Sequence, residues 1–178
     1  SEEERFRTVE SKISTDDRRN PLKHLTDTYG DEYPAKTLKV LYEYSQRGER
    51  GCAELLLKRF KDETLYNHET KEWLKYENGV WVKDSISNIK WRSQEFLLYI
   101  FTKIAHLAEG QEFRLKQLAR DDSDNEQELK REASRYKKFA QSFDKTKKAI
   151  TYKKTSDQIL ALLATEEDIG TATTDFDQ

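Results

Sequence analysis

The chain has 178 residues, with 32 Lys or Arg and 34 Asp or Glu, so its net charge is −2 and only 35% of its residues are hydrophobic. No run approaches the roughly 20 consecutive apolar residues of a membrane-spanning helix, which excludes a transmembrane protein, and the opening residues do not resemble a secretion signal. The single cysteine, Cys52, cannot form an internal disulfide, so we expect a reducing compartment and a cytoplasmic location.

The first elements in the chain are expected to be two helices that follow a polar segment. Residues 1–34 contain both prolines and few apolar residues, which is typical of a partly ordered segment with turns. From Ala35, apolar residues recur at helical spacing up to Gly48, and a second helix is expected from Cys52 to Phe60. These two segments predict a helical pair.

Three short aromatic or β-branched segments come next, at residues 64–66, 73–76 and 80–82. Asn78-Gly79, between the last two, is a pair that tight hairpin turns favour because both residues accept a positive φ. The pattern predicts a three-stranded antiparallel meander within residues 64–84. So small a sheet is not stable alone and has to pack one face on helices.

The most apolar segment, residues 96–108, covers more than half of a helix circumference and is expected to form the central helix of the core. Acidic residues 121–124 predict a turn or helix cap before a long helix at residues 125–143. The expected fold class is therefore α+β and mostly helical, with the small sheet packed on a multi-helix bundle.

The end of the chain is expected to hold one more helix. Residues 157–164 carry isoleucine and leucines at helical spacing, with Ser156 as the expected N-cap. Residues 166–178 then form an acidic tail of small residues.

Charge is unevenly distributed towards the C-terminus. Residues 130–154 carry ten Lys or Arg and two acids, whereas residues 155–178 carry six acids and no Lys or Arg. At 100° per residue, four cations fall within about 80° of one another, opposite the apolar side of the helix at residues 125–143. We call these four residues, Arg131, Arg135, Lys138 and Lys145, the basic stripe.

A line of cations of this kind suits contact with successive phosphates of a nucleic acid. Lys147 and Lys148 continue the basic run and are further candidates for nucleic-acid binding. The alternative interpretation is the solvated side of an ordinary amphipathic helix.

Aromatic residues of the expected sheet allow a second nucleic-acid site. Trp73, Tyr76 and Trp81 lie on strands whose side chains alternate, so some of them can share a face and stack nucleobases. Packing against the neighbouring helices is favoured, because a small sheet needs its large rings to cover them.

The sequence predicts no catalytic residue, metal site or cofactor site. No glycine is followed by the Gly-Lys pair of a phosphate-binding loop, and the three histidines are too scattered to share a zinc ion with Cys52. The acidic run at Asp122 lacks the glycine and the final glutamate of a calcium loop. His68 and its neighbouring glutamates have no accompanying nucleophile.

Several short motifs resemble a known family. They are the helix at residues 52–60, Thr64-Leu65-Tyr66, and the segment from Glu72 to Trp81 with Trp73, Tyr76, Gly79 and Trp81 at its signature positions. They resemble the N-terminal helicase-flanking domain of phage, plasmid and poxvirus-type primase-helicases, whose motors are superfamily-three DNA helicases. The spacing in this segment is one residue tighter than the common form of the signature.

The resemblance extends from residue 51 to residue 178, although residues 86–154 match only as helix. Ser156 to Ala164, followed by Asp175-Phe176-Asp177, is similar to the segment that precedes the helicase core in that family. The absence of methionine, even at position 1, indicates a fragment of a longer protein. Three parts are expected: a polar segment at 1–34, the helicase-flanking domain at 35–165, and a tail at 166–178 that leads towards a helicase core.

The resemblance implies a noncatalytic domain of a DNA replication helicase or primase-helicase that supports ring assembly and DNA engagement beside an ATPase motor. The implied partners are DNA, the helicase core of the same chain and further copies of the protein, without a membrane. ATP and magnesium belong to the expected parent helicase, which can also carry a primase or primase-polymerase upstream. The alternative is a protein–protein assembly module without DNA affinity, and a small independent hydrolase is disfavoured by the missing catalytic residues.

Overall fold

The computed structural model describes residues 33–171. Most of the expected N-terminal segment, and the Asp175-Phe176-Asp177 motif, lie outside the described residues. The described part is mostly helical with one small sheet, which confirms the expected α+β class. Its elements are α3 (Tyr33–Gln46), α4 (Gly48–Phe60), β1 (Thr64–Asn67), β2 (Glu72–Glu77), β3 (Val80–Asp84), α5 (Ile86–Asp121), α6 (Glu126–Ile150), α7 (Lys153–Ala164) and β4 (Gly170–Thr171).

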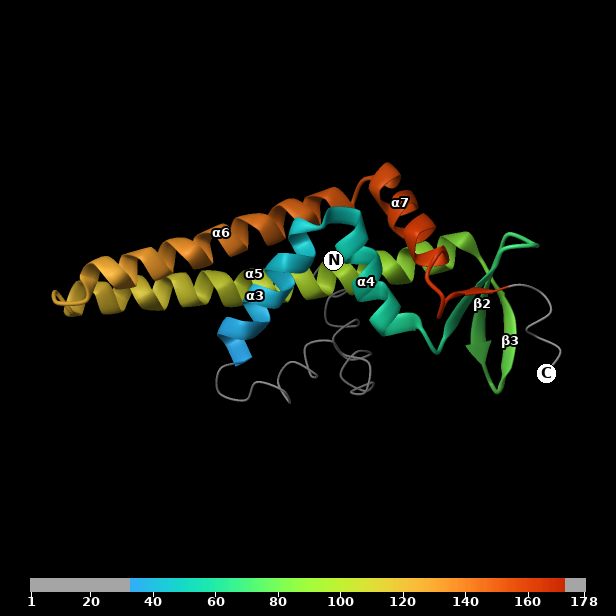
Figure 1. Cartoon of the computed structure of the whole chain (residues 1–178), viewed down its shortest axis with the longest axis horizontal. Helices are drawn as coiled ribbons and strands as arrows, with labels where there is room; N and C mark the ends of the chain where they lie inside the picture. Colours follow the sequence, from blue (N-terminus) through green and yellow to red (C-terminus); the bar gives the residue numbers. More distant parts are fainter. Residues whose placement is uncertain (1–32, 172–178) are drawn as a thin grey trace, which may run out of the picture.

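The helix α5 is the axis of the molecule, and α6 runs back along it as an antiparallel hairpin (Figure 1). The expected core helix at residues 96–108 is only the middle of α5, which has 36 residues and continues through Gly110. The two helices share a core in which the rings of Phe101 and Phe143 lie 6.2 Å apart between centroids. The expected turn between them is present, and the backbone N–H of Asn125 donates to the Asp122 carboxylate at 3.2 Å.

The far end of this hairpin projects beyond the other elements (Figure 1). Between residues 109 and 132 the only buried side chains are Leu115 and Ala119. We call residues 109–132 the arm. Among the described residues, the two helices of the arm pack mainly on each other, so few of their side chains are buried.

The helices α3, α4 and α7 pack on the other half of the hairpin, and the expected α3–α4 pair is present (Figure 1). Tyr42 of α3 contacts Phe139 of α6 with ring centroids 4.6 Å apart. Fully or nearly fully buried leucines line this part of the core, namely Leu38, Leu41, Leu55, Leu56, Leu160 and Leu163.

The sheet has the strand order β3-β2-β1-β4, so the prediction of a three-stranded antiparallel meander is wrong in two respects. A fourth strand is present, and it pairs with β1 in parallel. The backbone N–H of Tyr66 donates to Ile169 at 2.7 Å, and that of His68 donates to Thr171 at 3.0 Å. A two-residue strand has no hydrophobic period of its own, and this one forms because α7 and the buried Ile169 return the chain to β1.

The start of the last helix also differs from the prediction. The helix α7 begins at Lys153, and Ser156 lies inside it instead of capping it. The Ser156 hydroxyl is buried, donates to the Ile150 carbonyl at 2.9 Å and lies 2.7 Å from the amide nitrogen of Gln94. Ser156 therefore ties α7 to the ends of α5 and α6, a role that depends on tertiary contacts.

Candidate nucleic-acid interface

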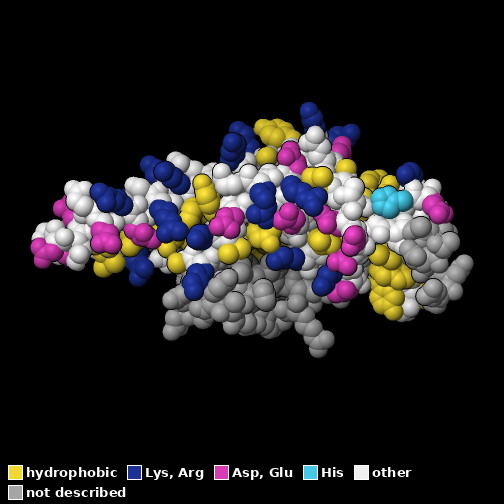
Figure 2. Space-filling view, viewed as in Figure 1, with side chains coloured by type: hydrophobic (Ala, Val, Ile, Leu, Met, Phe, Trp, Pro, Cys, Tyr) yellow, Lys and Arg dark blue, Asp and Glu magenta, His cyan; other side chains and the backbone are white. Residues whose placement is uncertain are grey.

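The helix α6 places the basic stripe on a solvent-exposed surface. Its buried side is built from small and aromatic residues, so the opposite side faces outwards. All four residues of the stripe are exposed. In the space-filling view, Lys and Arg side chains follow α6 along the upper edge of the molecule (Figure 2).

The ion pairs of the stripe are weak. Arg135 lies 3.8 Å from the Glu132 carboxylate, and both side chains are about half exposed to solvent. Its guanidinium also lies 5.4 Å from the centre of the Phe139 ring, which fixes the direction of the side chain. Exposed ion pairs contribute little free energy, so a phosphate can replace Glu132 as the partner of Arg135 at little cost.

Lys147 and Lys148 do not continue the line of the stripe. At 100° per residue, Lys147 is rotated about 160° and Lys148 about 100° from Arg131. Lys147 lies 3.9 Å from Asp144, and both lysines belong to the last turn of α6, where positive charge is favoured by the helix dipole. The structure therefore separates these two predicted binding residues from the other four.

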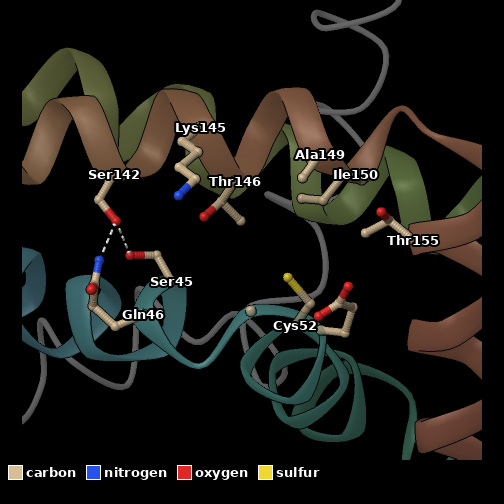
Figure 3. Close-up of a pocket in the computed structure, with 11 residues that line it drawn as sticks. Ser45, Gln46, Cys52, Ser142, Lys145, Thr146, Ala149, Ile150 and Thr155 are labelled. Carbon is tan, nitrogen blue, oxygen red and sulfur yellow. Dashed lines mark hydrogen bonds between the residues drawn. The ribbon is translucent and has the colours of Figure 1, made fainter.

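Lys145 connects the stripe to a cavity of about 230 Å³ between α3, α4, α6 and α7 (Figure 3). Polar groups line much of it. The Gln46 amide donates to the Ser142 hydroxyl at 2.8 Å, and the Ser45 hydroxyl lies 2.7 Å from the same oxygen. The remaining polar lining residues are Glu49, Lys145, Thr146 and Thr155.

The cavity also contains the thiol of Cys52 (Figure 3). Burial, and secondly the charge of Glu49, raise the pKa of the Cys52 thiol to about 12. The thiolate is the reactive form of cysteine, so this thiol is unreactive near neutral pH. The cavity is therefore suited to binding a polar group and not to nucleophilic chemistry.

No sequence pattern indicated this cavity. Ser45 and Ser142 lie 97 residues apart in the chain, and each is one of many serines in amphipathic helices. Among the residues that line the cavity, only Lys145 was a predicted binding residue. The polar neighbours of Lys145 on α3, Ser45 and Gln46, depend on how α3 packs beside α6 in the folded chain.

The aromatic signature residues divide between the two faces of the sheet. Trp73 is only 5% exposed and contacts Tyr66 with ring centroids 4.9 Å apart, so it belongs to the core. Tyr76 and Trp81 pair across β2 and β3 on the opposite face, with ring centroids 5.2 Å apart. Gly79 has a φ of +84° in the expected Asn-Gly turn.

The surroundings of the Tyr76–Trp81 pair are less suited to nucleic acid than the stripe. The lysine on the same face, Lys83, already has an acidic partner, since its amine lies 2.5 Å from the Glu72 carboxylate. Stacking platforms for nucleic acids combine exposed rings with an excess of cations. The stripe on α6 is therefore the stronger candidate.

The described residues contain no candidate metal site and no candidate membrane-spanning helix. From residue 33 to residue 171, no three His, Cys, Asp or Glu side chains gather in a way that suits a metal ion. None of the helices in this range combines the length and hydrophobicity needed to cross a bilayer. Comparisons with protein-family models, curated proteins and solved structures gave no match to the chain.

Proposed function

We propose that this chain is a noncatalytic domain of a DNA replication helicase or primase-helicase, and that α6 engages the DNA backbone. The observation that carries the proposal is the basic stripe. From Arg131 to Lys145 it extends about 21 Å along α6, at 1.5 Å per residue. A strand of B-DNA advances about 3.4 Å per phosphate, so the stripe is long enough to follow several phosphates.

Contact with phosphates of this kind does not depend on base sequence. Lys145 lines the cavity, where the second N–H of the Gln46 amide offers a further donor for a phosphate oxygen. In the proposed arrangement, Arg131, Arg135 and Lys138 bind DNA phosphates along α6. Lys145 binds the phosphate at the last position of the stripe. Such a domain holds DNA for a motor that acts on any sequence.

The resemblance of the sheet region to helicase-flanking domains supports the assignment to a replication protein of a phage, plasmid or virus. Trp73 and Gly79 of the signature have structural roles in the core and the hairpin turn, which suits a scaffold. ATP and magnesium act at the helicase core of the proposed parent protein, in the cytoplasm of a host cell.

A second candidate is a protein–protein assembly module without DNA affinity. The observation that favours it is the pair of the half-exposed Tyr76 and the partly exposed Trp81, near the half-exposed Val80 at the tip of the hairpin. Exposed aromatic residues with few free cations around them are typical of protein contacts. The helicase core of the same chain is the expected partner for this surface.

The two candidates are separated by fluorescence anisotropy with labelled single- and double-stranded DNA. We expect Arg131→Glu, Arg135→Glu and Lys138→Glu together to weaken binding by more than about a hundredfold at low salt, because three favourable phosphate contacts become repulsive. An affinity equal to that of the unaltered chain contradicts the DNA proposal. Assembly without measurable DNA affinity supports the second candidate.

A further inference from the structure

Four aromatic rings of the described residues are about half exposed or more, and they differ in the charges around them. They are Tyr76, Trp91, Phe113 and Tyr152. The four residues on either side of Phe113 carry two acids and two cations, and those around Tyr76 carry two acids and one lysine. Both cations next to Trp91 have acidic partners. Tyr152 differs from these, because residues 145–156 contain five lysines and no Asp or Glu.

The fold does not use the ring of Tyr152. This residue lies between α6 and α7 at the N-cap position of α7, but its side chain makes no capping hydrogen bond. Its ring is 56% exposed, and within residues 33–171 it pairs with no other ring and its hydroxyl makes no hydrogen bond. The backbone around it is fixed, since the Tyr152 N–H donates to the Ala149 carbonyl at 3.1 Å. The turn therefore presents a free ring to solvent.

Two lysines close to this ring are also free. Lys148 precedes Tyr152 by four residues and Lys154 follows it by two, and both are exposed without an ion pair to any described acid. The other two lysines of the turn differ, because Lys147 lies 3.9 Å from Asp144 and Lys153 lies 3.7 Å from Asp157.

The free lysines continue the positive charge of the basic stripe. Lys148 lies one helical turn beyond Lys145 and is rotated by only 60° from it. At the upper edge of the molecule, where α6 ends, Figure 2 shows Lys and Arg side chains on both sides of an exposed hydrophobic surface. A strand that follows the stripe from Arg131 to Lys145 therefore reaches the turn with Tyr152 next.

We propose that the ring of Tyr152 stacks on a base of single-stranded DNA, and that Lys148 and Lys154 bind the phosphates on either side of that base. An exposed ring flanked by cations suits a single strand, because every base has a flat face and every nucleotide carries a negative phosphate. The bases of a duplex are stacked on one another, so a surface ring does not reach them. The site selects single strands and does not read their sequence.

This inference rests on the proposed DNA contact of α6 and names the kind of DNA that is bound. The basic stripe contacts only the backbone, which single and double strands share. The ring adds a contact that only an unpaired base can make. The two contributions can therefore be measured separately.

The test is fluorescence anisotropy of the 178-residue chain with three labelled DNAs of equal length. They are a thymidine single strand, a single strand of abasic sites with the same backbone, and a duplex. We expect the unaltered chain to bind the intact strand more tightly than the abasic one. Tyr152→Ser should weaken binding of the intact strand at least about fivefold, the lower end of one base–aromatic stack, and leave the other two affinities unchanged.

Matched variants separate the ring from the charges. Tyr152→Phe keeps the ring and should keep full affinity, and Tyr76→Ser removes another half-exposed tyrosine and should change none of the three affinities. Lys148→Gln with Lys154→Gln should weaken binding of the intact and abasic strands alike, because both strands carry phosphates. Circular dichroism should show an unchanged helix content for every variant, since all these side chains are exposed.

The failure of this inference differs from the failure of the proposed function. Equal affinity of the unaltered chain for intact and abasic strands overturns the stacking and leaves the backbone contact of α6 in place. An unchanged affinity of Tyr152→Ser for the intact strand does the same, as does Tyr152→Phe binding as weakly as Tyr152→Ser. A chain with no affinity for any of the three DNAs contradicts the proposed function and this inference together.

Discussion

The hydroxyl oxygens of Ser45 and Ser142 lie 2.7 Å apart and join α3 to α6 across 97 residues of sequence. This contact joins the two helices at the edge of the cavity. Lys145 of the basic stripe lines the same cavity. The position of Lys145 relative to Gln46 therefore depends on the Ser45–Ser142 pair.

Removal of the Ser45 hydroxyl should destabilise the junction modestly. Ser45→Ala loses the hydrogen bonds to the Tyr42 carbonyl and to Ser142, and we expect a loss of about 1 kcal/mol in the free energy of unfolding. Urea denaturation measures it. Gln46→Ala is the matched control, because Gln46 makes an exposed hydrogen bond to the same serine. An equal cost for the two variants would argue against the buried pair as the main link.

The salt dependence of DNA affinity should report how many phosphates the basic stripe contacts. Each phosphate contact adds about 0.7 to 0.9 to the slope of log affinity against log salt concentration. Replacement of Arg131, Arg135 and Lys138 by Gln should therefore lower the magnitude of the slope by about 2 to 3. The control is the same substitution at three exposed lysines elsewhere, Lys61, Lys71 and Lys83. Similar slopes for both triple variants would indicate a general effect of net charge.

The two faces of the sheet should respond differently to alanine. Trp73→Ala should cost about 3 to 5 kcal/mol, because it opens a cavity in the core beside Tyr66. Tyr76→Ala removes a ring that is 51% exposed and should cost less than about 1 kcal/mol. Thermal and urea unfolding of both variants provide the comparison. Equal losses would mean that the Tyr76–Trp81 pair supports the fold as much as the core does.

Arg92 should be essential for the junction between α5 and the sheet. Its guanidinium lies 3.2 Å from Glu63 and 3.7 Å from Asp84, and 4.8 Å from the centre of the Phe60 ring. Arg92→Leu leaves both carboxylates without this cation in a largely buried place, so we expect a loss of about 2 to 4 kcal/mol. Lys130→Gln, which removes the exposed pair with Glu126, should cost less than about 0.5 kcal/mol. A loss below about 1 kcal/mol for Arg92→Leu would contradict this role.

Cys52 should make stability fall at alkaline pH. Burial raises the pKa of the thiol from 9.0 to about 12, so the unfolded chain loses its proton first as the pH rises. The contribution of the thiol is complete below pH 9 and decreases between pH 9 and about 12. In that window the free energy of unfolding should fall by roughly 1 kcal/mol per pH unit relative to Cys52→Ala. Parallel pH profiles for the two proteins would show that the thiol is not protected.

The same burial predicts slow chemical modification. Native protein at pH 8 should react with iodoacetamide far more slowly than protein in denaturant, because the thiolate is scarce and the sulfur is covered. Mass spectrometry follows the reaction. Equal rates in the two conditions would place Cys52 at the surface.

Local sequence patterns predicted much of this structure. The amphipathic period indicated α6 and its charged side, and Asn78-Gly79 indicated the hairpin turn that the structure confirms. The alternation of β2 and β3 allowed aromatic residues to share a face, and Tyr76 and Trp81 do so. These features depend on residues close together in sequence, whose geometry the backbone fixes.

Contacts between distant segments decided the rest. The strand β4 exists because the chain returns to β1, Ser156 serves as a link and not as a cap, and the cavity requires four helices to meet around Lys145. The sequence by itself determined where in the chain the helices form, though not their full lengths, and which side of α6 is charged, because these follow from backbone periodicity. Only the tertiary structure decided which polar groups meet around Lys145 and which link Ser156 makes, because both depend on how helices far apart in the chain pack together.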